Sequence, residues 1–200
     1  MDILVIISLI STFLFGISAA ISAIHKRFDL IGIFFISFLS GTGGGIVRDV
    51  MLGKYPIACA KDPIYLISII VSVMVTIIFK LKNHKPLRTF ILIDSLGLGS
   101  ATILGIQKAL NTNINPIMSI IFGVISACFG SVIRDILCNE TPLLFKKELY
   151  ASISILGGIV YILLIQFGLN IVPTSFLCVT LIFVFRIISI KYKLTLPRVY

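Results

Sequence analysis

The chain has 200 residues, of which 58% are hydrophobic and 12% are charged, and its mean hydropathy is +1.13. Soluble domains carry about twice that charged fraction, so the composition excludes a soluble globular protein and indicates an integral membrane protein. The net charge of +9 does not indicate nucleic-acid binding, because the basic residues lie in short stretches between apolar segments, where membrane topology accounts for them.

Seven apolar segments are predicted to cross the bilayer, which takes about 20 residues per helix. They cover residues 3–24, 30–52, 64–79, 89–108, 116–137, 149–167 and 173–190. The sequence therefore predicts an all-α membrane protein, with a single transmembrane domain over residues 1–190 and a basic cytoplasmic tail over residues 191–200.

The second segment contains the most informative stretch, GTGGGIVRDVML at residues 41–52. Glycines and charges are concentrated there: Gly41, Gly43, Gly44, Gly45, Arg48 and Asp49. Glycine loosens a helix, and charges at membrane depth normally face a protein interior or an aqueous cavity. The pattern predicts a helix broken at the glycines that exposes backbone carbonyls to a solute. Close helix packing is the alternative, since Gly41 and Gly45 have the G-x-x-x-G spacing.

The Arg48–Asp49 pair recurs as Arg134–Asp135, at an offset of 86 residues (134 − 48). The same offset matches further positions of the two halves: Ser40 with Ser126, Gly44 with Gly130, Pro56 with Pro142, Lys61 with Lys147, and Asp62 with Glu148. We interpret this as two three-helix repeats, about residues 3–79 and 89–168, followed by a seventh helix at about 173–190. Because three spans is an odd number, the second repeat is inverted in the membrane, an architecture of transporters and channels.

The charged residues inside the segments need partners. Neighbours on a regular helix point about 100° apart, so these residues are not assumed to pair with each other. Each is expected to find a partner on another helix, with Asp94 and Glu148 as candidates, or at the backbone carbonyls freed by the break. Arg186, one turn inside the end of the seventh segment, is expected to extend toward the interface.

No signature of an enzyme or cofactor site is present. The cysteines and histidines lack metal-ligand spacing, no nucleotide-binding motif is complete, and no nucleophile has a histidine base near it in the sequence. We therefore predict no enzyme activity, no cofactor and no resident metal.

Lysine and arginine are distributed unequally between the two sides. The even-numbered connections hold Lys54, Lys61 and Lys108, whereas the odd-numbered connections and the tail hold Lys26, Arg27, Lys80, Lys82, Lys85, Arg88, Lys146, Lys147, Lys191, Lys193 and Arg198. The positive-inside rule predicts an outside N-terminus and a cytoplasmic C-terminus.

Several motifs together resemble the TRIC family, the trimeric intracellular cation channels, and its prokaryotic relatives, some of which are labelled glycine-transporter-like. They are GGG-x-x-RD at 43–49, LG-x-x-P at 52–56, G-x-x-x-RD at 130–135, NE-x-P at 139–142 and KELYA at 147–151. The resemblance covers almost the whole chain and looks like a prokaryotic member, which implies an inner-membrane location. It also implies a homotrimer that contacts membrane lipids, with one pore per protomer passing monovalent cations, chiefly potassium.

The resemblance further implies that the glycine-kinked second and fifth helices line this pore, with transient potassium at backbone carbonyls near Gly43 and Gly44. In the fifth helix the second glycine triplet of the family is reduced to Phe129, Gly130 and Ser131. Phe129 is then either a hydrophobic plug or a ring facing lipid.

Two functions remain open from the sequence. A passive cation channel would use the carbonyls of the broken helix and the fields of Asp49 and Asp135. A secondary transporter for a small zwitterion such as glycine would use an arginine fork for the carboxylate.

Overall fold

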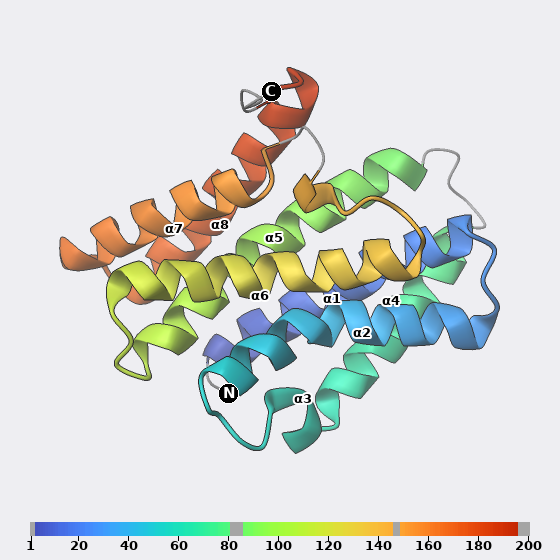
Figure 1. Ribbon diagram of the computed structural model, residues 1–200, viewed down its shortest axis with the longest axis horizontal. Helices are drawn as coiled ribbons and strands as arrows, with labels where there is room; N and C mark the ends of the chain where they lie inside the picture. Colours follow the sequence, from blue (N-terminus) through green and yellow to red (C-terminus); the bar gives the residue numbers. More distant parts are fainter. Residues whose placement is uncertain (1–2, 81–85, 146–148, 196–200) are drawn as a thin grey trace.

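The computed structural model describes residues 3–80, 86–145 and 149–195, and this part of the chain is folded as a bundle of α-helices (Figure 1). The elements in chain order are α1 (Ile3–His25), α2 (Leu30–Met51), α3 (Ala58–Lys61), α4 (Ile64–Lys80), α5 (Pro86–Leu110), α6 (Pro116–Leu137), the 3-10 turn η1 (Leu143–Phe145), α7 (Ala151–Gln166) and α8 (Ile171–Lys191).

Each of the seven predicted segments corresponds to an apolar helix. Among the described residues, α1, α2, α5, α6 and α8 are long and apolar enough to cross a membrane. Helices α4 and α7 are apolar but shorter. The 16 residues of α7 extend about 24 Å, against a hydrocarbon core of about 30 Å. The sequence did not predict the short elements α3 and η1.

Side-chain caps define where α2 and α6 begin. The Asp29 carboxylate accepts a hydrogen bond of 2.8 Å from the Gly32 amide, and the Asn115 side chain accepts one of 2.9 Å from the Ile117 amide. Each cap satisfies an amide that the first turn of a helix leaves unbonded. The two capping residues are 86 positions apart, which is the offset of the sequence repeat.

The start of α8 differs slightly from its prediction. The helix begins at Ile171 rather than at Pro173. Proline is tolerated in the first helical turn, where an amide has no acceptor within the helix, so Pro173 marks the beginning of α8 without being its first residue.

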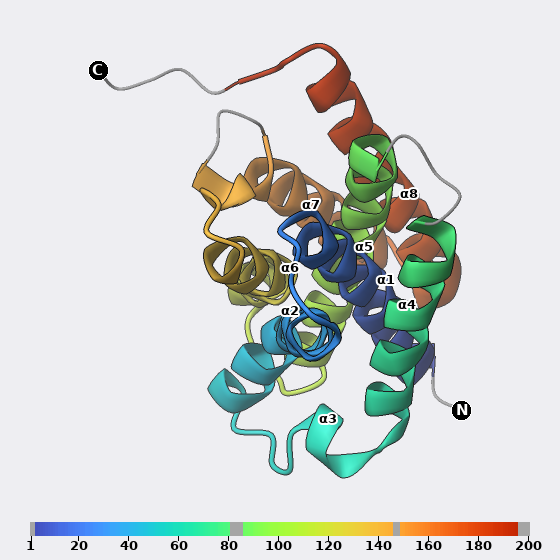
Figure 2. The ribbon, with the colours of Figure 1, turned by 90° about the vertical axis from the view of Figure 1, so that its right-hand side faces the viewer.

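Helix α5 lies in the middle of the bundle and packs on α1, α6 and α8 (Figure 2). Small residues allow these contacts. A Cβ atom on Gly97 would lie 3.3 Å from the Phe15 ring of α1, and one on Gly105 would lie 2.7 Å from Gly123 Cα of α6. The small residues Gly97 and Gly105 of α5 therefore allow close helix contacts within one protomer.

Helices α2 and α6 cross in antiparallel directions at a pair of glycines, and both views show them side by side (Figures 1 and 2). A Cβ atom on Gly44 would overlap the carbonyl oxygen of Ser126, and one on Gly130 would overlap the carbonyl oxygen of Ser40. The contact is reciprocal, because Ser126 and Gly130 lie 86 residues after Ser40 and Gly44. Close packing is therefore one reason for glycine at these two positions.

No non-helical residue interrupts α2, so the glycines do not break its helical backbone, and a kink at these glycines stays a prediction. The chain is helical without interruption from Leu30 to Met51, and α6 is likewise continuous from Pro116 to Leu137. The two charge-bearing ends of these helices consequently lie on opposite sides of the crossing, with their backbone carbonyls in use within the helices.

We predict that Gly44→Ala separates α2 from α6 and lowers the melting temperature, because the added methyl group meets backbone rather than a movable side chain. The cost should be about 1–3 kcal/mol, as for other overpacked sites. Gly45→Ala is the matched control, since a Cβ there meets only Arg48 Nη2, at 3.4 Å. Equal melting temperatures for the two variants in detergent would contradict the packing role of Gly44.

Candidate functional site

The α2 charge site comprises Arg48, Asp49 and Lys108. Arg48 donates from Nε and Nη2 to Asp49 Oδ1, at 2.9 and 2.7 Å, and from Nη1 to the Ser126 hydroxyl on α6, at 3.0 Å. Arg48 and Asp49 thus pair with each other although neighbours on a regular helix point in different directions. The pair forms because the long arginine side chain folds back toward Asp49. Arg48 also reaches another helix, as predicted.

Lys108 is a member of this site that the sequence did not single out. Its Nζ lies 3.5 Å from Asp49 Oδ1, while Asp49 Oδ2 accepts from the Ala58 amide at 3.2 Å. Lys54 Nζ donates to the Lys108 carbonyl at 3.4 Å. The sequence feature that could have indicated its role is the position of a lysine near the end of an otherwise apolar helix. The α2 charge site therefore holds two cationic groups and one carboxylate.

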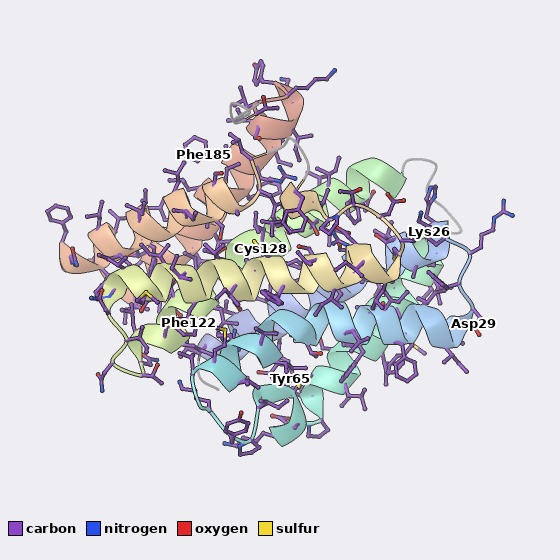
Figure 3. The ribbon with its side chains drawn as sticks, in the orientation of Figure 1. Lys26, Asp29, Tyr65, Phe122, Cys128 and Phe185 are labelled. Carbon is purple, nitrogen blue, oxygen red and sulfur yellow. The ribbon has the colours of Figure 1, made fainter. Side chains whose placement is uncertain are left out.

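A small polar cavity borders the α2 charge site. It lies among α1, α2, α4, α5 and α6, with α3 at one side. Hydroxyl groups from three helices and a tyrosine line it: Ser8, Ser11, Thr12, Ser40, Thr42, Ser126 and Tyr65. Tyr65 is labelled in Figure 3, at the start of α4. The space open to the centre of a water molecule is about 30 Å³, enough for about two waters.

The α6 charge site comprises Arg134, Asp135 and Asp94. Arg134 donates from Nε to Asp135 Oδ1 at 2.8 Å and from Nη1 to Asp94 Oδ1 on α5 at 2.5 Å. Nη1 also reaches the Ser18 hydroxyl on α1 at 2.5 Å. The guanidinium carbon lies 4.7 Å from the centroid of the Phe90 ring. Asp94, one of the two candidate partners predicted from the sequence, is therefore confirmed as a partner of Arg134.

Arg186 does not extend to the interface as expected. Its side chain is buried, its guanidinium carbon lies 4.9 Å from the centroid of the Tyr150 ring, and Nη1 donates to the Leu149 carbonyl at 3.2 Å. Residues 149 and 150 precede α7, so α8 is attached to the start of α7 by this arginine. The prediction was wrong because the aromatic partner, Tyr150, comes from the segment just before α7, which the position of Arg186 in the sequence does not reveal.

The remaining residues predicted for the site differ in burial, and they do not gather at one place. Phe129 is 42% exposed on the outer face of α6, so it does not plug the protomer in this conformation. Ser131 is buried and donates to the Cys128 carbonyl at 2.8 Å within α6, and Figure 3 places Cys128 on the same helix. A Cβ on Gly41 would meet Ile69 and Thr12, and one on Gly43 would meet Ile133. Glu148 lies outside the described residues.

Metal chemistry finds no support in the described ranges. Within residues 3–80, 86–145 and 149–195, no group of three or more histidine, cysteine, aspartate or glutamate residues is placed to hold a metal ion. The four cysteines are unpaired thiols, and Cys59 borders the cavity. The chemistry available at the site is therefore charge pairing and hydroxyl coordination.

Curated relatives of this chain are bacterial membrane proteins. The chain is 30% identical over 193 residues to the inner membrane protein YadS of Escherichia coli, covering 96% of this chain and 93% of that protein. It is also 30% identical over 198 residues to a membrane protein of Vibrio cholerae, covering 98% and 82%.

Solved structures similar to this chain are channels. The trimeric intracellular cation channel orthologue from Rhodobacter sphaeroides matches with a TM-score of 0.91 and 25% identity, over 97% of this chain and 100% of that one. A prokaryotic TRIC channel solved in 0.5 M KCl matches with a TM-score of 0.86 and 31% identity, over 97% and 98%.

The sequence model of the family described as "Glycine transporter" matches the chain twice, over residues 5–80 and 91–166. The starts of the two matches, like their ends, are 86 residues apart (91 − 5 and 166 − 80), as are the two arginine–aspartate pairs. With the bacterial relatives and the solved channels, these matches show that the chain is an integral membrane protein that belongs to the glycine transporter family, the family of the prokaryotic TRIC channels.

Proposed function

We propose that this protein is a potassium-preferring monovalent cation channel whose pore runs through each protomer between α2 and α6. The observation that carries the proposal is the hydroxyl-lined cavity beside Asp49 at the α2–α6 crossing. Pore selectivity depends on pore diameter and on the polar groups lining it. The solved relatives of the chain are described as cation channels.

The groups that would meet the ion differ from those expected. Because α2 is continuous, the carbonyls of Gly43 and Gly44 belong to its helical hydrogen bonding. The oxygen atoms offered instead are hydroxyls, of which Thr42 donates its proton to the Phe38 carbonyl at 2.6 Å and so keeps its lone pairs available. We propose that potassium passes along these hydroxyls rather than along freed carbonyls.

The described conformation corresponds to a closed path. Arg48 and Lys108 both lie next to Asp49, so a cation leaving the cavity on that side meets two fixed positive charges. Like charges a few Å apart in a low-dielectric interior repel strongly. Conduction therefore requires Arg48 or Lys108 to move away from Asp49.

We propose the two-repeat, seven-span arrangement as the scaffold of this path. The caps, the α2–α6 glycine contact and the two family matches all recur at the offset of 86. Residues with positive φ recur as well, in the pairs Arg27 with Asn113 and Gly53 with Asn139. The antiparallel crossing of α2 and α6 agrees with an inverted second repeat.

A secondary transporter for a small zwitterion is the second candidate, favoured by the family description and by the arginine fork. Two features weigh against it. Arg48 already uses its fork on Asp49, and the cavity has space for about two waters, whereas glycine has five heavy atoms. A carrier would need a considerably more open conformation.

Flux through the purified protein in liposomes tests the proposal. We expect potassium flux that does not saturate with concentration in the way a carrier does, single-channel steps in bilayers, and no uptake of glycine. Saturable glycine uptake without unitary currents would establish the transporter instead.

A cavity variant tests the path itself. Thr12→Val removes one hydroxyl from the cavity wall at nearly constant volume, so potassium flux should fall several-fold while the melting temperature holds. Thr180→Val is the matched control, because Thr180 is on α8, away from the cavity, and donates to the Phe176 carbonyl. An equal effect of both variants on flux would place the path elsewhere.

We propose that the N-terminus lies outside and the C-terminus in the cytoplasm, on the distribution of lysine and arginine. A cysteine at Tyr55, which is exposed between α2 and α3, should react with an impermeant thiol reagent added to intact cells. A cysteine at Lys193, after α8, should react only after lysis. The reverse pattern would invert the topology.

We propose a homotrimer, which the similarity to the trimeric intracellular cation channel orthologue from Rhodobacter sphaeroides supports. Native mass measurement in mild detergent should give three times the 22.0 kDa of one chain. A stable monomer or dimer that still conducts would show that the pore needs no trimer.

A further inference from the structure

The two charge sites begin with the same geometry. In each, Nε of the arginine donates to Oδ1 of the following aspartate, at 2.9 Å for Arg48 and 2.8 Å for Arg134. In each, the other carboxylate oxygen accepts a backbone amide from the next short element, Ala58 for Asp49 and Leu143 for Asp135. Any difference between the sites therefore arises beyond these shared contacts.

The sites differ at both terminal nitrogens of the arginine. Arg48 Nη2 donates to Asp49 Oδ1 at 2.7 Å, whereas Arg134 Nη2 has no hydrogen-bond partner among the described residues. The partners of Nη1 differ as well. Arg48 Nη1 donates to the Ser126 hydroxyl across the helix crossing. The residue matching Ser126 is Ser40, but Arg134 Nη1 turns instead to Asp94 and Ser18. The Ser40 hydroxyl is buried and has no hydrogen-bond partner among the described residues. Asp94 has thus drawn Arg134 away from the contact that the symmetry of the fold offers.

The cause is visible at the matching positions of the sequence. At the offset of 86, Asp94 corresponds to Ser8 and Ser18 corresponds to Leu104. Both Ser8 and Leu104 line the cavity beside Arg48. In the first half a short neutral side chain, Ser8, thus stands where the second half has a carboxylate. The cavity beside Arg48 therefore lies at the position that corresponds, in the second half, to the carboxylate partner of Arg134.

Charge separates the sites further, although both arginine–aspartate pairs are buried, with Arg48 1% and Asp49 2% exposed. Arg134, Asp94 and Asp135 carry one positive and two negative charges, and all three are less than 9% exposed. Arg186 approaches this region from α8 through the Tyr150 ring. The α2 charge site carries two positive charges and one negative, borders a cavity, and includes Lys108, which is only partly buried. One site is enclosed by carboxylates, and the other is short of them.

We propose that the two sites have diverged in role: the α6 charge site is a fixed lock that joins α1, α5 and α6, and Arg48 is the movable arginine. The difference is set by Asp94 in one half and Ser8 in the other. Removing a buried arginine from two carboxylates leaves three charges uncompensated. When Arg48 moves, it leaves only the Asp49 carboxylate, and Lys108 remains beside that carboxylate to balance its charge. Motion that opens the cavity is therefore confined to the α2 side.

Ser8→Asp tests the proposal by building the missing carboxylate into the first half. It should pair with Arg48 as Asp94 pairs with Arg134, raise the melting temperature by about 5 °C, and lower potassium flux at least tenfold. Ser8→Asn fills the same space without the charge and should not raise the melting temperature. In the double variant Ser8→Asp with Arg48→Met the stabilisation should be lost, because the new carboxylate has no arginine partner.

Labelling of the native Cys59 thiol supplies a readout that does not depend on ion flux. Cys59 borders the cavity, and burial raises the pKa of its thiol, so labelling is compared at one fixed pH. Ser8→Asp should slow its labelling by a small thiol reagent at least fivefold relative to Ser8→Asn. Cys59→Ser is the background control.

The outcomes separate this inference from the proposed function, on which its flux prediction rests. If the wild-type protein passes no cation, the channel proposal fails, while melting temperature and Cys59 labelling still decide the lock. If Ser8→Asp fails to raise the melting temperature above that of Ser8→Asn, or leaves Cys59 labelling unchanged, a carboxylate at position 8 does not fix Arg48. Either result refutes the proposed difference between the two sites. Slower labelling with higher stability supports it.

Discussion

A guanidinium group inside an apolar helix bundle keeps its charge, so oxygen atoms from the surrounding helices must reach it. Arg48 and Arg134 are the two residues of the α2–α6 crossing that impose this requirement. Their neighbouring aspartates supply the first oxygens, and Ser126, Ser18 and Asp94 supply the others. The glycine contact matters because only a close crossing of α2 and α6 brings Ser126 within reach of Arg48.

We propose that this requirement also explains why the two arginine–aspartate pairs, which recur in the sequence, differ in their surroundings. Two arginine–aspartate pairs that share the Nε to Oδ1 hydrogen bond can differ in mobility when one more carboxylate is added to one of them. Asp94 encloses Arg134, whereas Ser8 leaves a cavity beside Arg48. Under the proposed channel function, the α6 charge site would hold the helices together while the α2 charge site opens, and the exchange of Asp94 for Ser8 is the difference that we propose divides these roles.

The sequence predicted the apolar helices and the burial of both charged pairs, because hydropathy is a local feature of the chain. The arrangement of the helices as two inverted repeats stays a proposal. The sequence named Asp94 as a candidate partner of an intramembrane arginine, but it did not predict the other contacts that depend on a neighbouring helix. The glycines of α2 indicated a break, but the overlap between Gly44 and the Ser126 carbonyl is visible only once α6 is placed. Arg186 failed for the same reason, since its aromatic partner Tyr150 comes from the start of α7.

The most direct measurement is a pair of double-mutant cycles on the free energy of unfolding. One cycle combines Arg134→Met with Asp94→Leu, and the other combines Arg48→Met with Ser126→Ala. Residues joined in one buried network couple, whereas independent residues add. We predict a coupling of about 2 kcal/mol or more for the α6 pair and less than about 1 kcal/mol for the α2 pair. Equal couplings, or additive effects at Arg134 and Asp94, would contradict the account of a locked and a movable site.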